Sequence, residues 1–260
     1  PELMQKMRKQ AERFGATIKD VDVESADFTP STRSARSGSS ADLEVVGDGV
    51  TYHGRAVIIA TGAETKWLGI ESEQKLIGRG VSSCAPCDAP FFKEKKVIVV
   101  GGGDSAMEEA LVLSKFATSV TIVHRRDAFR ASQIMQDKVK ADPKISIVFD
   151  STVEEILGEQ KVTGVKIKNI KTEEQKEIET DGVFVAIGHT PVTSLFKEVI
   201  TTDEVGYIVP KDHTHTNVEG VFVAGDVHDH HYRQAVTAAG FGCMAAMDAE
   251  RWLESRDVVK

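Results

Sequence analysis

Long apolar runs are absent from this sequence of 260 residues. No stretch approaches the roughly 18 consecutive apolar residues that a membrane-spanning helix needs, and no signal-peptide pattern is visible. Basic residues are also in the minority, because 32 Lys and Arg stand against 40 Asp and Glu, for a formal net charge of −8. This balance argues against nucleic acid as a general partner. We therefore expect a cytoplasmic protein that binds neither membranes nor nucleic acid.

Cysteine is scarce as well, with three in the whole chain. Cys84 and Cys87 form one Cys-x-x-Cys pair, and Cys243 stands alone in a helical stretch, where we expect a small packed residue. A structural zinc site needs a second Cys/His pair, and no histidine spacing supplies one, so we expect no metal. In an intracellular chain the pair favours a dithiol–disulfide switch, because such thiols exchange through a mixed disulfide. Asp88, directly after the pair, is either the group that moves the thiol proton or a helix cap or surface carboxylate.

What the sequence does contain is an apolar strand that runs directly into glycines. Four β-branched residues, 97–100, precede three glycines, and residues 104–113 then have apolar residues at helical spacing. This order predicts a buried parallel strand, a tight turn and a helix. Gly101, Gly103 and Ala106 fit the dinucleotide fingerprint, in which the turn and the helix N-terminus hold a pyrophosphate. A glycine-rich turn alone can also be a simple connection between a strand and a helix, with no ligand bound to it.

Basic residues follow the next predicted strand, which covers residues 119–123. About 20 residues after the glycine turn, an NAD site carries an acidic residue for the ribose hydroxyl. This chain has His124-Arg125-Arg126 at that point, with Arg130 close behind. The planar fork of arginine pairs with phosphate oxygens bidentately, so the pattern predicts NADPH with its 2′-phosphate. The alternative is a solvated basic turn.

The remaining segments predict a mixed α/β chain. We expect a helix over residues 2–14, a strand over 17–23, a loop over 30–40 and a hairpin over 43–52. Short strands, partly antiparallel, are expected between residues 146 and 187, and a long helix rich in small residues over 232–253. Two buried strands end in Thr61-Gly62 and in Gly225-Asp226. Such ends mark either backbone that passes close to a flat or charged ligand or simple turns.

Several sequence blocks then occur in the order found in one enzyme family, and they extend over nearly the whole chain. The blocks are Cys84-Ala85-Pro86-Cys87-Asp88, Gly101-Gly102-Gly103-Asp104-Ser105-Ala106, His124-Arg125-Arg126-Asp127-Ala128-Phe129-Arg130-Ala131, Ala186-Ile187-Gly188-His189-Thr190-Pro191, Ala224-Gly225-Asp226-Val227, Tyr232-Arg233-Gln234-Ala235 and Gly242-Cys243-Met244-Ala245-Ala246. Together they resemble the low-molecular-weight thioredoxin reductases. Alkyl hydroperoxide reductase flavoproteins have similar blocks, whereas ferredoxin/flavodoxin NADP reductases lack the cysteine pair.

The resemblance implies an α/β fold of two interleaved Rossmann-like nucleotide-binding domains with three-layer ββα architecture. An NADPH-binding domain that carries the cysteine pair is expected at residues 64–189. An FAD-binding domain is expected in two parts, residues 1–63 and 190–260. The family begins with a glycine-rich strand and helix for the FAD pyrophosphate, and no counterpart precedes Pro1. The FAD domain is therefore expected to be incomplete in this chain, which should bind NADPH but purify nearly free of FAD.

The resemblance also implies a reaction, in which a thioredoxin-disulfide reductase passes electrons from NADPH through FAD and the Cys84/Cys87 disulfide to thioredoxin. Cys87 is expected to face the flavin, Cys84 to attack the thioredoxin disulfide, and Asp88 to act as acid and base. The enzyme is expected to be a homodimer. One departure is Ala89, where the family normally has glycine, followed here by Pro90, which stiffens the loop.

Cofactor-binding residues follow from the same motif positions. For the flavin, the resemblance implies Thr61, Gly62, Gly225, Asp226, Arg233, Gln234 and Ala235. For NADPH it implies Gly101, Gly103, Asp104, Ser105, Ala106, His124, Arg125, Arg126 and Arg130, and Ile187 and Gly188 complete the cofactor-binding set.

Three alternatives stay open at this point. The chain can be an NADPH-binding fragment or sensor without flavin, or a related flavoprotein disulfide reductase such as a peroxiredoxin reductase. A redox-inert interaction protein is the third, and the Cys84/Cys87 pair argues against it.

Overall fold

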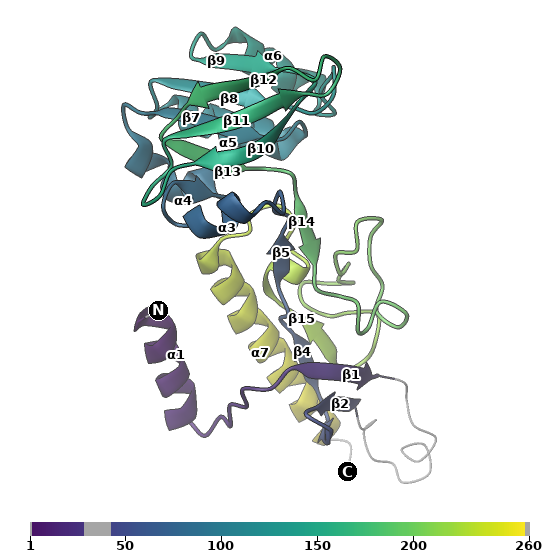
Figure 1. The fold of residues 1–260 in the computed structure, drawn as a ribbon. Helices are drawn as coiled ribbons and strands as arrows, with labels where there is room; N and C mark the ends of the chain where they lie inside the picture. Colours follow the sequence, from purple (N-terminus) through teal and green to yellow (C-terminus); the bar gives the residue numbers. More distant parts are fainter. Residues whose placement is uncertain (1, 29–42, 258–260) are drawn as a thin grey trace. The chain divides into compact units, whose positions relative to one another are not determined.

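The computed structural model describes residues 2–28 and 43–257 (Figure 1). The chain divides into two compact units, unit 1 with Pro1–Ala63 and Pro191–Lys260, and unit 2 with Glu64–Thr190. It therefore passes between the units twice. Both crossings lie in short strands, β5 (Ala63–Thr65) and β14 (His189–Pro191), which are neighbours in a two-stranded sheet. The loop expected over residues 30–40 lies outside the described residues.

A five-stranded sheet in the order β6-β13-β7-β8-β9 forms the centre of unit 2. Every neighbouring pair in it is parallel. Parallel neighbours require a crossover connection, and helix α5 (Asp104–Ser114) makes the one from β7 to β8. The strand bounds are Val81–Ser82 for β6, Gly182–Val185 for β13, Lys96–Val100 for β7, Ser119–Val123 for β8 and Ile145–Val148 for β9.

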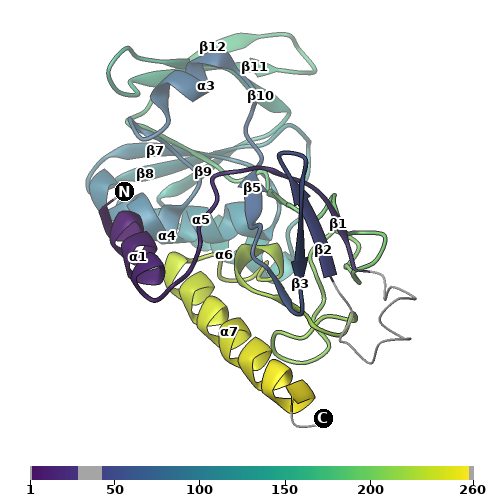
Figure 2. The same cartoon turned by 90° about the horizontal axis from the view of Figure 1, so that it is seen from below.

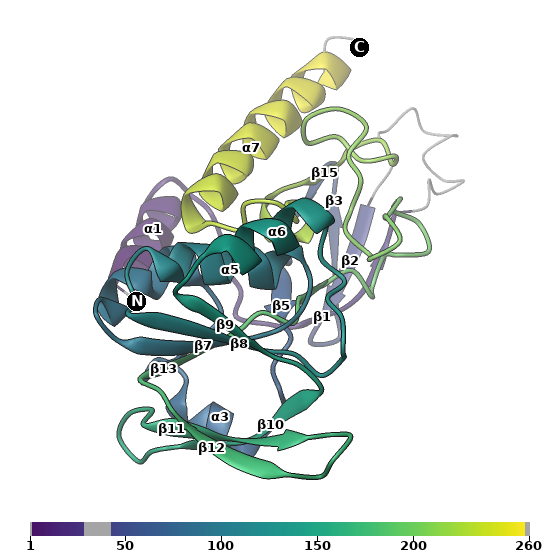
Figure 3. The ribbon, with the colours of Figure 1, turned by 90° about the horizontal axis from the view of Figure 1, so that it is seen from above.

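Different layers cover the two faces of this sheet, as Figures 2 and 3 show. Helices α5 and α6 (Gln133–Ala141) cover one face, and an antiparallel sheet covers the other. Val97 and Val99 belong to the core beneath the helices, whereas Ile98 and Val100 belong to the core beneath the antiparallel sheet. A strand buried on both faces needs a continuous apolar sequence, which residues 97–100 provide. The predicted three-layer ββα architecture is confirmed in unit 2.

The antiparallel sheet of unit 2 has the order β10-β11-β12. Its strands are Ser151–Leu157, Gly164–Asn169 and Gln175–Glu179. Helix α3 (Glu71–Leu76) packs against β10, and the Ser72 hydroxyl accepts a hydrogen bond from the backbone N–H of Ile156 at 2.9 Å. After β6, the short helices α4 (Ala85–Asp88) and η1 (Ala89–Phe92) lead into β7.

The described part of unit 1 includes an antiparallel sheet, a parallel pair of strands and helical segments. Strands β1 (Val23–Asp27), β2 (Leu43–Gly47) and β3 (Val50–Gly54) are antiparallel, and β4 (Val57–Ile59) runs parallel to β15 (Val221–Val223). The predicted hairpin is confirmed. The strand predicted over residues 17–23 is wrong in position, because the chain instead pairs from Val23 onward, where Ala26 and Phe28 reach the unit 1 core.

Helix α7 (Ala235–Asp257) is 23 residues long, yet its only fully buried side chains are Ala245 and Ala249. It packs against β4 and β15. Cys243 is exposed on it, so the expectation of a packed cysteine is wrong. None of the helices in the described part of the chain combines the length and apolar character needed to cross a membrane.

Helix α1 (Glu2–Arg13) shows the apolar stripe that the sequence predicts, but it has no buried residue. Leu3 is 68% exposed and Phe14, just beyond the helix, is 82% exposed. An ion pair between Arg8 and Asp20, at 2.7 Å, connects the helix to the following segment. Within the described residues, no side chain of α1 belongs to a hydrophobic core.

Phe91 and Phe92 offer a matched test of the unit 2 core. Phe92 is 8% exposed and packs edge to face on Phe184, with ring centroids 5.1 Å apart, whereas Phe91 is 72% exposed. We expect Phe92→Ala to lower the free energy of unfolding of unit 2 by about 3–5 kcal/mol, because it leaves a cavity. Phe91→Ala should change it by less than about 0.5 kcal/mol. Urea titration followed by circular dichroism measures both, and equal losses would contradict this account of the core.

Candidate active site

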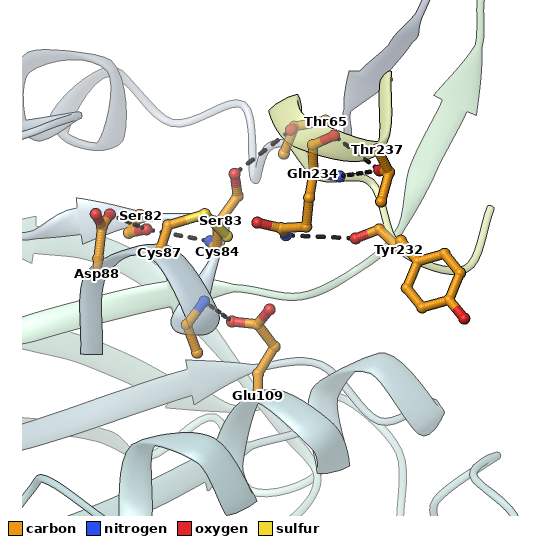
Figure 4. Close-up of a disulfide and its surroundings, with 11 residues drawn as sticks. Thr65, Ser82, Ser83, Cys84, Cys87, Asp88, Glu109, Tyr232, Gln234 and Thr237 are labelled. Carbon is orange, nitrogen blue, oxygen red and sulfur yellow. Dashed lines mark hydrogen bonds between the residues drawn. A yellow bond between two sulfur atoms is a disulfide. The ribbon is translucent and has the colours of Figure 1, made fainter. Parts of the chain in front are cut away.

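A disulfide joins Cys84 and Cys87 where strand β6 gives way to helix α4 (Figure 4). The Cα atoms are 5.3 Å apart, within the usual range for a disulfide. Cys84 immediately precedes the helix and is half-buried, whereas Cys87 lies on the helix and is exposed. A helix that begins inside the Cys-x-x-Cys sequence brings the two cysteines onto one side of a single turn. The structure thus forms the disulfide that the spacing predicts.

Ser82 connects Asp88 to the first cysteine (Figure 4). Its hydroxyl donates to Asp88 Oδ2 at 2.6 Å and accepts a hydrogen bond from the backbone N–H of Cys84 at 3.1 Å. Ser82 is 8% exposed, so this contact is nearly shielded from water. The Asp88 carboxylate is therefore held beside the cysteine turn. Sequence reasoning missed Ser82. Its position two residues before Cys84 was the available signal, because a hydroxyl there can bond to the backbone of the cysteine turn.

Glu109, on helix α5, also bonds to the turn that carries the two cysteines (Figure 4). Its Oε2 atom accepts a hydrogen bond from the backbone N–H of Ala85 at 2.6 Å. Glu109 lies on α5 among fully buried positions, including Ala106, Met107 and Ala110. Sequence reasoning missed this residue too, and its signal was a carboxylate within the apolar stripe of a helix.

The glycine turn between β7 and α5 is shaped by close contacts on one side and open space on the other. A Cβ atom on Gly101 would lie 2.4 Å from the Ala186 carbonyl oxygen, and one on Gly102 would lie 2.2 Å from the His124 ring. A Cβ on Gly103 would meet nothing within 4 Å. Gly103 begins the helix, and no side chain caps it. The turn therefore leaves room for a ligand beside the N-terminus of α5, where Ser105 lies and where N–H groups favour an anion.

The basic loop after β8 is attached to this turn. The backbone N–H groups of Arg130 and Ala131 both donate to the Gly102 carbonyl oxygen, at 2.8 and 3.2 Å. Arg125, Arg126 and Arg130 are exposed. The structure therefore brings the predicted arginines and the predicted glycines together within unit 2.

His124 is buried beneath the turn. It is 6% exposed, and its Nε2 atom has no hydrogen-bond partner among the described residues. Burial lowers the pKa of His124 below its usual value, a hydrogen bond with the Ala128 backbone opposes the change, and the neighbouring arginines add to the lowering. A neutral ring therefore supports the glycine backbone.

The other predicted residues of unit 2 have different surroundings. Asp104 Oδ1 accepts hydrogen bonds from the Ser132 backbone N–H and hydroxyl at 2.9 and 2.8 Å, so this carboxylate ties α5 to the start of α6. Ile187 is 39% exposed. It directly follows Ala186, whose carbonyl oxygen lies against Gly101. The Gly188 carbonyl accepts a hydrogen bond from the Lys66 N–H at 2.9 Å. Their roles in cofactor binding stay predictions.

In unit 1, the predicted residues follow the two buried strands: Thr61 and Gly62 connect β4 to β5, and Gly225 and Asp226 begin a short 3-10 helix, η2 (Gly225–Val227). The Thr61 hydroxyl donates to the Val192 carbonyl oxygen at 2.6 Å, and the Gly62 carbonyl accepts from the Val192 N–H at 3.0 Å. Gly225 has a φ of 74°, a conformation that favours glycine. The residue after it, Asp226, has an Oδ1 atom that is buried and without a hydrogen-bond partner among the described residues.

Asp226 and Asp229 are adjacent carboxylates with opposite environments. Burial raises the pKa of Asp226, repulsion from Asp229 adds to the rise, and Arg233 opposes it. Burial acts in the same direction on Asp229, but its pKa falls below the usual range because backbone N–H groups donate to it. Those donors belong to His231, Tyr232 and Arg233, at 3.0, 2.9 and 3.1 Å. Asp229, which sequence reasoning missed, thus anchors the segment that carries Arg233, Gln234 and Ala235.

Residues 2–242 match the family described as pyridine nucleotide-disulphide oxidoreductase. The chain belongs to this family. A relative named thioredoxin reductase from Streptomyces clavuligerus is 52% identical over 256 residues, which cover 97% of this chain and 76% of that protein. One of the same name from Rickettsia conorii is 51% identical, over 97% of this chain and 80% of that protein.

Solved structures of thioredoxin reductases are also similar to this chain. The thioredoxin reductase from Giardia duodenalis is 45% identical with a TM-score of 0.89, over 98% of this chain and 81% of that one. The thioredoxin reductase from Streptococcus pyogenes is 40% identical with a TM-score of 0.87, over 98% of this chain and 80% of that one. The predicted α/β fold with Rossmann-like domains is therefore confirmed, and so is the resemblance drawn from the sequence blocks.

Thioredoxin reductases of this family use NADPH and FAD, and the residues present fit both groups. For NADPH, the open side of Gly103 suits a pyrophosphate, and the three exposed arginines attached to the turn suit a 2′-phosphate. For FAD, the buried Oδ1 atom of Asp226 requires a donor. The ribityl and ribose hydroxyl groups of a flavin dinucleotide are donors of that kind.

We expect the arginines to decide between the two nicotinamide coenzymes. Replacing Arg125 and Arg126 together by alanine should weaken NADPH binding by tens of fold or more, because each charge-assisted hydrogen bond lost costs about 1.5–3 kcal/mol. NADH has no 2′-phosphate, so its affinity should hardly change. Isothermal calorimetry measures both affinities, with Arg79→Ala, a change at an exposed arginine elsewhere in unit 2, as the control. Equal losses for the two coenzymes would overturn the assignment.

Proposed function

We propose that this chain is an NADPH-dependent thioredoxin-disulfide reductase. One observation carries the proposal: a disulfide lies in the same compact unit as a dinucleotide-type glycine turn, and its own turn is bonded to Asp88 through Ser82 and to Glu109 through the Ala85 N–H. The names and high identity of the relatives support thioredoxin as the substrate. A homodimer and a cytoplasmic location belong to the proposal and rest on the family resemblance.

We assign NADPH binding to unit 2 and flavin binding to unit 1. In unit 2, Gly101, Gly103 and the first turn of α5 hold the pyrophosphate, and Arg125, Arg126 and Arg130 hold the 2′-phosphate. In unit 1, the turns at Thr61-Gly62 and Gly225-Asp226 and the segment Arg233-Gln234-Ala235 hold the flavin. When bound, the flavin supplies the two electrons that the disulfide requires.

The chemistry of the chain's own residues is thiol–disulfide exchange. Two electrons and two protons convert the Cys84–Cys87 disulfide into two thiols. One thiol loses its proton, and the thiolate attacks the thioredoxin disulfide, so that one new sulfur–sulfur bond forms as the old one breaks. The second thiolate then attacks the mixed disulfide, which releases thioredoxin as a dithiol and restores the Cys84–Cys87 bond. Asp88, fixed by the Ser82 hydroxyl, is positioned to hold and return the proton at the thiols.

The state of the cysteines is directly measurable. The oxidised protein should show one reactive thiol, that of exposed Cys243, and three after reduction. Alkylation with and without reductant, followed by mass spectrometry, counts them. A thiol count that does not change on reduction, with zinc released by a chelator, would overturn the proposal.

The order in which the cysteines act is a second test. The resemblance gives the attack on thioredoxin to Cys84, but an attacking sulfur must be accessible, and Cys87 is the exposed one. We therefore expect Cys84→Ser protein, which keeps Cys87, to form a mixed disulfide with thioredoxin at least tenfold faster than Cys87→Ser protein, by non-reducing gel. The reverse ranking would restore the order that the resemblance implies. Cys243→Ser is the matched control and should leave both rates unchanged.

NADPH-dependent reduction of thioredoxin tests the reaction as a whole. The purified protein is supplied with FAD, unbound FAD is removed, and the flavin absorbance of the protein is followed as NADPH and then oxidised thioredoxin are added. Loss of the flavin band with NADPH and its return with thioredoxin support the proposal. NADPH binding without any flavin band would instead favour the flavin-free NADPH sensor.

A further inference from the structure

The Glu109 side chain contacts the cysteine turn from a different helix. Helix α4 packs against α5, and the hydrogen bond from Ala85 N–H to Glu109 Oε2 is short, at 2.6 Å. Hydrogen bonds to an ionised acceptor are shorter and stronger than neutral ones. Ala85 is fully buried and directly follows Cys84. The bond therefore fixes the peptide next to the first cysteine.

We propose that Glu109 is a positioning residue that sets the reducing strength of the Cys84/Cys87 pair, by placing a negative charge beside the cysteine turn. The inference rests on the proposed function for its place in the reaction, since it concerns how readily the pair gives up electrons. Its test does not require flavin, NADPH or thioredoxin.

The ionisable side chains of α4 and α5 are all acidic. Helix α4 itself carries Asp88, and α5 contributes Glu109. The other two acidic residues of α5 are Glu108, which is exposed, and Asp104, which is bound to Ser132. Helix η1, which also packs against α4, has the sequence APFF and no ionisable side chain. The charge beside the cysteines is therefore negative on the elements packed against them.

An anion at this place changes the redox equilibrium through the thiolate. Reduction of the disulfide by dithiothreitol transfers two electrons and two protons, giving two protein thiols and cyclic oxidised dithiothreitol. At higher pH, one thiol releases its proton and becomes a thiolate, and stabilisation of that thiolate stabilises the reduced protein. Strongly oxidising disulfides owe their character to a stabilised reduced form. Glu109 works in the opposite direction, because its charge disfavours the thiolate and keeps the dithiol a strong reductant.

Glu109→Gln isolates the charge, because the amide oxygen can still accept the hydrogen bond from Ala85. Wild-type and variant chains are equilibrated with mixtures of reduced and oxidised dithiothreitol, and the dithiol fraction is measured by alkylation and mass spectrometry. At about pH 9, where the thiolate is populated, we expect the variant's equilibrium to favour the dithiol about three- to tenfold more. A tenfold change corresponds to about 30 mV. At about pH 6, where both thiols are protonated, the difference should be less than about twofold.

The control is Glu108→Gln, which removes the same charge one residue earlier on the same helix. It should shift the equilibrium by less than about twofold at either pH, since that side chain points to solvent. A loss of packing alone would shift the equilibrium equally at both pH values. The growth of the effect with pH is therefore the signature of the charge.

A measurement on the wild-type protein keeps the inference testable if the variant does not fold. Thiolate absorbance of the reduced protein gives the lower thiol pKa, which we expect not to fall below the usual value of a free cysteine, although the pKa of Cys-x-x-Cys thiols is often lowered. A wild-type value well below this, or an unchanged equilibrium in Glu109→Gln at both pH values, would overturn the role of Glu109. A pair that dithiothreitol cannot reduce would instead overturn the proposed function.

Discussion

Burial of strand β7 on both faces is the constraint on which the rest of unit 2 depends. Because Val97 and Val99 face the helices while Ile98 and Val100 face the antiparallel sheet, the strand has no solvent-exposed side. Its exit must therefore pass between packed neighbours, and the Ala186 carbonyl and the His124 ring occupy the space where side chains on Gly101 and Gly102 would lie. The same close approach leaves the Gly103 side open. Tight packing of the sheet and the open space at Gly103, where we propose that a dinucleotide binds, are thus two results of one geometry.

The sequence predicted those parts of the fold that local pattern controls. Residues 97–100 required a strand buried on both faces, and the Cys-x-x-Cys spacing required a turn that a disulfide can close. The contacts of Ser82 and Glu109 were not predictable in the same way, because each depends on which elements pack together in three dimensions. Strand β1 was misplaced because residues 17–23 alternate as a strand does, while pairing with β2 and access to the core select Val23–Asp27. Cys243 was expected to be packed because it lies in a helical stretch and free cysteine is often buried, but Ala245 and Ala249 are the only buried residues of α7.

The candidate flavin-binding residues show how hydrogen bonding separates two similar groups. Asp226 and Asp229 have the same side chain; Asp229 is buried, and Asp226 is half-buried with its Oδ1 atom shielded from water. Backbone N–H groups solvate Asp229 and make it an anchor for the segment that follows. Asp226 Oδ1 has no such donor among the described residues. A buried oxygen atom without a hydrogen bond lowers the stability of the folded chain, and a bound ligand that donated a hydrogen bond would remove this loss. Such a cost is typical of a binding residue and not of a structural one.

The two crossings of the chain at β5 and β14 have a consequence for the order of events during synthesis. Strand β4 pairs in parallel with β15, and Val57 lies opposite Val221. All of unit 2 is encoded between them. As the chain leaves the ribosome, β4 therefore emerges long before its partner strand exists, whereas unit 2 is translated without interruption and can fold as a unit first. Ile58, which is 39% exposed even in the folded chain, lies on β4. The interval before β15 is made is thus the period when the edge of β4 that β15 will cover is unpaired and open to other strands.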